Sequence, residues 1–162
     1  MAETDARALL TTNDVARELL GSARVARLAY TWRDGTPRVV PMWFHWTGEA
    51  IVMGAPPNSP KMRVLRERPA VAVDIDDDQW PYQVLSIRGT ASAEVVDGIF
   101  PEYEAMARRY LGEEGAAQFL GLARQTFSRW TRVTIRPAEA RLLDFGAGQF
   151  PSAWSAGAAA RA

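Results

Sequence analysis

The sequence contains no cysteine, and its 162 residues include one histidine and one lysine. Without cysteine there can be no disulfide, no thiolate metal site and no cysteine nucleophile, and we expect a reducing, cytoplasmic location. The single histidine, His45, does not make a metal site, because such sites need several ligands. No carboxylate neighbour that would make it a general base can be assigned from the sequence.

The chain also lacks an excess of one charge and a long hydrophobic run. Its 19 basic and 19 acidic side chains cancel, so we expect neither nucleic acid nor a membrane surface as a partner. No apolar run reaches the ~20 residues of a membrane-spanning helix. The polar, acidic start predicts no signal peptide, and the length is typical of one domain with its own core.

Several catalytic motifs are missing as well. The sequence holds no G-x-S-x-G, no P-loop, and no G-x-G-x-x-G after a strand. The carboxylates of Asp76–Asp78 are adjacent, whereas a calcium loop needs spaced ligands and a glycine turn, so a solvated acidic loop is expected there. If the protein is an enzyme, a bound cofactor therefore supplies the difficult chemistry.

One stretch combines a buried strand with the start of a helix. The apolar run 50–53 predicts a strand, and Ser59 and Pro60 are typical of a helix cap and a first helical residue. Lys61 and Arg63 follow in the first turn, where cations repel the helix dipole unless an anion is bound. This pattern predicts a phosphate site made of Ser59, Lys61 and the helix start. The alternative is an ordinary capped surface helix with solvated cations.

A second segment, Arg38–Trp43, precedes that strand by one hairpin, so the two should lie side by side. Pro41 interrupts the ladder and leaves backbone groups free to face a planar heterocycle, which Trp43 could flank. Alternatively, Val39, Val40 and Trp43 belong to the core and Arg38 is a surface cation.

The whole pattern predicts an α+β protein, mainly β, with about six antiparallel strands in meander order that close or nearly close into a barrel. We expect a flexible arm over residues 1–11, one domain over 12–145 and a tail over 146–162. The predicted helices are 14–20, 59–68, 102–111 and 113–125. The predicted strands are 24–32, 38–46, 50–53, 70–75, 82–96, 128–135 and 139–145, with a bend or bulge at Arg88-Gly89.

Several short segments, taken in order, resemble the pyridoxamine 5′-phosphate oxidase-like flavin-binding split-barrel family. They are Thr36–Trp43, Ile51–Ala55, Asn58–Lys61, Leu65–Pro69, Val71–Asp74 and Tyr82–Ala91. The resemblance implies a six-stranded antiparallel split β-barrel with flanking helices. It also implies a homodimer that holds two cofactors at its interface.

The resemblance further implies which residues contact the cofactor FMN. The flavin ring would lie along Arg38 and the backbone of Val39, Val40, Pro41, Met42 and Trp43. Its ribityl-phosphate end would meet Gly54 and Ala55, and its phosphate would meet Ser59 and Lys61. The segment Trp80–Gln83 would cover the ring, from the partner subunit, and Trp80 and Gln83 are its candidate contacts.

Three departures from the family pattern stand out. Pro60 takes the place where many members carry arginine. Gln83 lies one residue farther from the glycine of the bend than the usual glutamine, which reverses its facing unless a bulge corrects it. The arginine-rich substrate motif of the true oxidase does not occur, so pyridoxamine phosphate is not the expected substrate.

The sequence thus predicts an FMN-dependent oxidoreductase that moves hydride through the flavin ring to or from an unidentified small molecule. One alternative is a reductase that uses a deazaflavin coenzyme, whose phosphate would occupy the same site. The other is a flavin-binding module without catalytic activity, since no acid or base is apparent.

Overall fold

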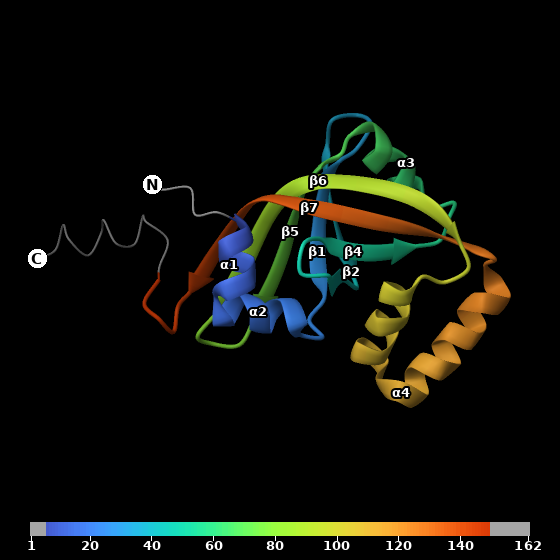
Figure 1. The fold of residues 1–162 in the computed structure, drawn as a ribbon. Coiled ribbons are helices and arrows are strands. Elements are labelled where there is room, and N and C mark those ends of the chain that lie inside the picture. The colour runs from blue at the N-terminus through green and yellow to red at the C-terminus, as the bar shows by residue number, and fades with distance from the viewer. Residues whose placement is uncertain (1–5, 150–162) are drawn as a thin grey trace, which may run out of the picture.

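The computed structural model describes residues 6–149. In this part of the chain one antiparallel sheet is flanked by helices (Figure 1). The elements in chain order are α1 (Ala6–Thr12), α2 (Asp14–Gly21), β1 (Ala26–Thr31), β2 (Pro37–Met42), β3 (His45–Trp46), β4 (Ile51–Ala55), α3 (Pro60–Glu67), β5 (Ala70–Asp77), β6 (Gln83–Asp97), α4 (Pro101–Thr126) and β7 (Arg129–Asp144).

The sheet has seven strands in the order β2-β1-β5-β6-β7-β4-β3 over the described residues, and it is not closed. The α+β class is confirmed, but the predicted six-stranded barrel is not. The segment predicted as one strand, 38–46, divides after Met42, and its two parts pair with different neighbours. β2 pairs with β1, and β3 pairs with β4. Pro41 therefore lies in an edge strand, where its missing N–H is tolerated.

The two last predicted strands are in fact one strand, β7, which pairs with β6 along its whole length. Between the pairs Arg88↔Glu139 and Gly89↔Pro137 the register shifts, and Ala138 is the extra residue. The predicted irregularity at Arg88-Gly89 is thus confirmed, with its additional residue on the partner strand. Gly89 is required here because a Cβ would overlap the carbonyl oxygen of Arg136.

The N-terminal arm is another correction. Residues 6–11 were predicted to be part of a loose segment, but they belong to α1, whose Ala6 and Leu10 are buried. These side chains, one helical turn apart, share the face that α1 turns toward the protein. Within the predicted tail, residues 146–149 form a turn, and residues 150–162 lie outside the described part.

Helix α4 was predicted as two helices separated at Gly112, and it has a kink at that residue. Gly112 adopts φ 72°, a left-handed conformation that glycine favours. The two arms of α4 turn back on each other beside the sheet (Figure 1). Within residues 6–149 no helix combines the length and apolar character needed to span a bilayer.

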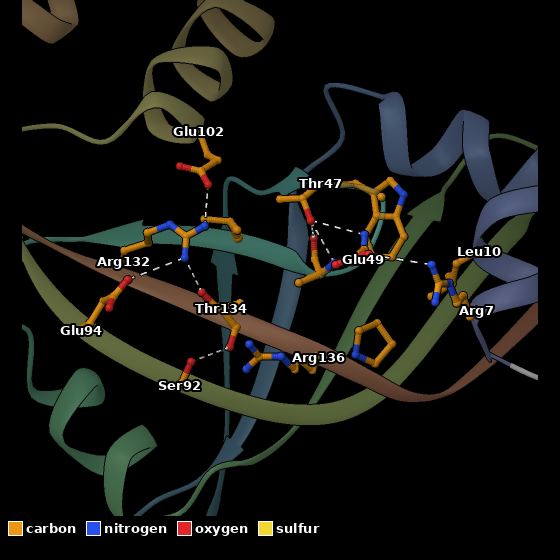
Figure 2. Close-up of a pocket in the computed structure, with 15 residues that line it drawn as sticks. Arg7, Leu10, Thr47, Glu49, Ser92, Glu94, Glu102, Arg132, Thr134 and Arg136 are labelled. Carbon is orange, nitrogen blue, oxygen red and sulfur yellow. Dashed lines mark hydrogen bonds and ion pairs between the residues drawn. The ribbon is translucent and has the colours of Figure 1, made fainter.

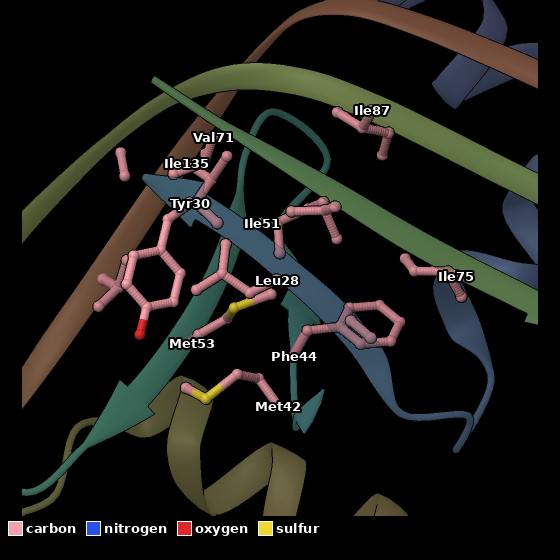
Figure 3. Close-up of a cluster of buried hydrophobic side chains, with 14 of the residues drawn as sticks. Leu28, Tyr30, Met42, Phe44, Ile51, Met53, Val71, Ile75, Ile87 and Ile135 are labelled. Carbon is pink, nitrogen blue, oxygen red and sulfur yellow. The ribbon is translucent and has the colours of Figure 1, made fainter. Parts of the chain in front are cut away.

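Two clusters of buried side chains hold these elements together. The larger one fills the inside of the curved sheet, where Leu28, Phe44 and Met53 are fully buried (Figure 3). The smaller one lies between α4 and the opposite face of the sheet and includes Tyr103 and Trp130. The sheet is therefore covered on both sides where β4 and β7 pair.

Candidate functional site

The start of α3 has the geometry that the sequence predicts. Ser59 is the N-cap residue, with φ −62° and ψ 122°, and Pro60 occupies the first turn. The backbone carbonyl of Ser59 accepts a hydrogen bond of 3.0 Å from the N–H of Met62. Its hydroxyl makes no cap hydrogen bond. This oxygen is therefore available to a ligand, unlike that of a capping serine.

The same turn carries positive charge that nothing in the described chain neutralises. Residues 6–149 supply neither Lys61 nor Arg63 with an ion-pair partner. The first turn of α3 holds no acidic residue. The free N–H groups and the positive end of the helix dipole add to this charge, so the start of α3 favours an anion.

The exposed part of β2 lies at the edge of the sheet. Arg38, Val39 and Pro41 are exposed, whereas Val40 packs against the core and Met42 is buried. Val39 stands out because 62% of its surface is accessible. Because β2 pairs only with β1, its other edge keeps unpaired backbone groups that a planar heterocycle could meet.

Two other predicted contacts are engaged in packing. The Trp43 ring stacks on Tyr110, with the centroids 5.0 Å apart and the planes 5° apart. Gly54 leaves room for Tyr103, because a Cβ at Gly54 would overlap that ring. Ala55 is 2% exposed. Trp43 and Gly54 pack against α4 and Ala55 is buried in the core, so a cofactor would meet mainly the backbone of these residues.

The segment predicted to cover the ring lies in the turn between β5 and β6. Trp80 is 67% exposed and packs edge to face against Tyr82, with the ring centroids 5.3 Å apart. Figure 1 shows this turn and α3 at opposite ends of the sheet. Trp80 and Lys61 of one chain therefore do not share one site, and the predicted contact would need a second subunit.

The facing of Gln83 follows from the bulge. Because the extra residue lies in β7, the alternation of β6 continues without interruption. Gln83 is on the same face as Leu85 and Ile87, which are buried in the core. β6 therefore has no bulge that would correct the reversed facing predicted from the one-residue offset of Gln83.

The structure also has two cavities that the predicted cofactor residues do not line, except that Val39 contributes to one of them. The larger cavity has a volume of about 1060 Å³ and lies on the outer face of the sheet. Val39, Ala72 and Ser86 are among the residues that line it. The smaller, about 740 Å³, lies near Arg132, between β7 and the β3–β4 turn (Figure 2). Sequence reasoning missed both because strands from distant parts of the chain form them. The alternating small and polar residues of those strands were the available signal.

The sequence profile of pyridoxamine 5′-phosphate oxidase matches residues 12–143. The chain belongs to this family. The resemblance drawn from the sequence is therefore confirmed, whereas no curated protein matches the chain.

Solved structures agree with this membership. An F420 reductase is 28% identical, with a TM-score of 0.60, and the match covers 77% of this family member and 94% of that chain. A conserved hypothetical protein from Mycobacterium tuberculosis is 22% identical, with a TM-score of 0.67 and coverages of 86% and 89%. An FAD and heme binding protein from Mycobacterium smegmatis is 19% identical, with a TM-score of 0.58 and coverages of 82% and 70%. The last two show the fold alone.

His45 of this family member is half-buried on β3 and has a perturbed titration. Burial lowers the pKa of His45 below its ordinary value, and the nearby Arg109 cation lowers it further, against the opposing effect of Glu102. The folded protein therefore takes up this proton at a lower pH than the unfolded chain does. No catalytic partner follows from this arrangement.

We expect the free energy of unfolding to fall as the pH drops through and below 6.5, the ordinary pKa of His45. Stability from this residue is complete above that pKa and is lost toward the lower folded pKa, at about 1.4 kcal/mol per unit of pKa difference before solvent screening. Urea unfolding between about pH 5 and 8 measures it. The variant His45→Gln should show a flatter profile; an unchanged slope would assign the effect to other groups.

Proposed function

We propose that this protein is a flavin-type oxidoreductase that binds FMN, with the cofactor phosphate at the start of α3. The observation that carries this proposal is that the polar groups at this helix start have no partner in the described chain. They are the hydroxyl of Ser59 and the cations Lys61 and Arg63. Anions bind such helix starts through backbone N–H groups and charge-assisted hydrogen bonds. Family membership supports the assignment.

The residues present fit the parts of the cofactor. Ser59 would donate its hydroxyl hydrogen to a phosphate oxygen, and Lys61 would supply an ammonium group. The unpaired edge of β2 would offer backbone groups to the heterocycle. When bound, the flavin supplies hydride transfer, and the protein binds and orients it. Trp80 and Tyr82 would help to shape the face where a small-molecule substrate approaches.

A homodimer with the cofactor at its interface is part of the proposal. The aromatic group of Trp80, Tyr82 and Phe145 is held together by edge-to-face contacts, yet Trp80 and Tyr82 are exposed. It lies at the end of the sheet away from α3 (Figure 1). A second copy would bring this group over the cofactor of the first. Analytical ultracentrifugation should give a dimer, and a monomer at micromolar concentration would refute this part.

A deazaflavin coenzyme is the second candidate, and one observation favours it. The F420 reductase is similar over 94% of its own chain, and a deazaflavin phosphate would use the same site at α3. A non-catalytic flavin-binding module is the third candidate, because no acid or base has been assigned.

Mass spectrometry and the absorbance spectrum of the purified protein test the proposal. We expect a bound flavin, or a rise in melting temperature when FMN is added, because a ligand of the native state stabilises it. A larger rise with a deazaflavin coenzyme would favour the second candidate. Reduction of the bound cofactor by a nicotinamide donor, followed by turnover of an acceptor, would exclude the non-catalytic module. A colourless protein that neither cofactor stabilises would contradict the proposal.

A further inference from the structure

The smaller cavity is a cleft of about 740 Å³ on the outer face of β7, and it is separate from the α3 site. Its floor carries Arg132, Thr134 and Arg136, and the β3–β4 turn and α1 form its walls (Figure 2). None of the predicted cofactor residues lines it. The volume is in the range of pockets that hold small molecules.

Most polar groups of this cleft already have partners. Arg132 donates to Oε1 of Glu102 at 2.5 Å and to Oγ1 of Thr134 at 2.7 Å. Its Nη1 also lies 3.7 Å from Oε1 of Glu94. The hydrogen bond from Arg132 to Glu102 is the main reason why the pKa of Glu102 is lowered. One guanidinium group thus pairs with both carboxylates, through a hydrogen bond to Glu102 and a longer ion pair with Glu94.

The turn at the opposite wall is also satisfied. Oγ1 of Thr47 accepts from the N–H of Ala50 at 3.0 Å and donates to the carbonyl of Ala50 at 3.2 Å. Oε1 of Glu49 lies 3.8 Å from Nη2 of Arg7. The Thr47 hydroxyl is therefore engaged within the turn, and the charge of Glu49 is paired with Arg7.

Arg136 is a cation of the cleft that is still able to bind an anion. Over residues 6–149 the guanidinium of Arg136 has no hydrogen bond and no ion pair. The hydroxyl of Thr134 points to Arg132, from which it accepts a hydrogen bond, and not to Arg136 (Figure 2). A free guanidinium matches the two oxygens of a carboxylate, which arginine binds in a bidentate manner.

The rest of the lining is partly apolar. Trp46 and Pro137, which are both partly exposed, contribute apolar surface to the cleft. We propose that this cleft binds a small organic carboxylate, with its anionic group on Arg136 and its apolar body against Trp46 and Pro137. This site would be additional to the cofactor site, and it does not depend on the proposed function.

Fluorine NMR of 4-fluorobenzoate added to the full chain tests the proposal. We expect broadening and a shift that saturate with protein, and about tenfold or greater weakening in Arg136→Gln, the loss expected for a charge-assisted hydrogen bond. The matched control is Arg129→Gln, which changes an exposed arginine of the same strand outside both cavities. This control should bind like the wild type.

Two further measurements identify the site and the ligand class. Lys61→Ala should leave the binding of 4-fluorobenzoate unchanged, and loss in that variant would assign the probe to the α3 site and overturn the proposal. Neutral 4-fluorobenzyl alcohol should bind more weakly. Inorganic phosphate should compete only weakly. If it displaced 4-fluorobenzoate with equal affinity, the apolar surface would play no part in binding. Undetectable binding, or equal binding to Arg136→Gln with an unchanged melting temperature, would also overturn it.

Discussion

The variant Lys61→Ala is expected to bind FMN about 1.5–3 kcal/mol more weakly than the wild type, roughly 10- to 150-fold in Kd. Lys61 is the only lysine of the chain, and no carboxylate in the described part pairs with it. Its removal therefore takes away a cation without releasing an anion. Titration calorimetry, or quenching of flavin fluorescence, measures the change.

The control for Lys61→Ala is Arg17→Ala, which removes an exposed cation from α2. Nη1 of Arg17 lies 3.5 Å from Oδ1 of Asp14 on the same helix, an exposed pair worth little. This control should bind FMN like the wild type. Wild-type affinity in a folded Lys61→Ala protein would show that the phosphate lies elsewhere.

The variant Tyr103→Ala should lose about 3–5 kcal/mol of unfolding free energy, as large aromatic truncations in a core do. The Tyr103 ring lies between α4 and the sheet, with centroids 4.7 Å from Trp130, 5.6 Å from Phe100 and 6.4 Å from Trp43. It also fills the space above Gly54. Burial raises its pKa to about 12, so its hydroxyl is neutral at ordinary pH.

Urea denaturation of Tyr103→Ala and of a matched variant measures this loss. Leu122→Ala truncates a side chain that is 64% exposed on the same helix, and it should change stability by less than about 0.5 kcal/mol. Equal effects of the two substitutions would mean that the aromatic cluster does not hold α4 to the sheet.

Local signals explain which parts of the fold the sequence could predict. The side chain of Asn13 caps α2 by accepting from the N–H of Ala16 at 3.0 Å, as its position before the apolar stripe indicates. Gly35 has φ 84° in the turn between β1 and β2, which an Asp-Gly pair favours. Pro60 begins α3 and Gly112 bends α4. Each of these features depends on neighbouring residues alone.

Tertiary pairing explains most of what the sequence could not predict. Pro137 indicates a turn, but β7 continues through it because β7 pairs with the long strand β6 on both sides. Pro137 pairs with Gly89 next to the extra residue Ala138. The division of 38–46 depends on which strands accept each half. α1 was missed because only the folded sheet gives Leu10 a place to be buried.

The candidate site likewise combines features that local sequence determines with features that tertiary packing determines. The helix start with Ser59 and Lys61 is a local pattern, and the structure forms it as expected. The engagement of Trp43 with Tyr110 depends on α4, which lies much later in the chain. The cleft around Arg136 needs the β3–β4 hairpin, the paired strands β6 and β7, and α1 together, so no short motif indicates it.

The additional residue in β7 has a wider consequence for how this architecture can change. Bulges bend and twist the strand that carries them, and here the bend separates two hollows along β7. Arg136 lies before it and belongs to the smaller hollow, whereas Arg141 lies after it and belongs to the larger. A substitution on one side of the bulge can therefore reshape one hollow while the other keeps its geometry, so the two can change independently.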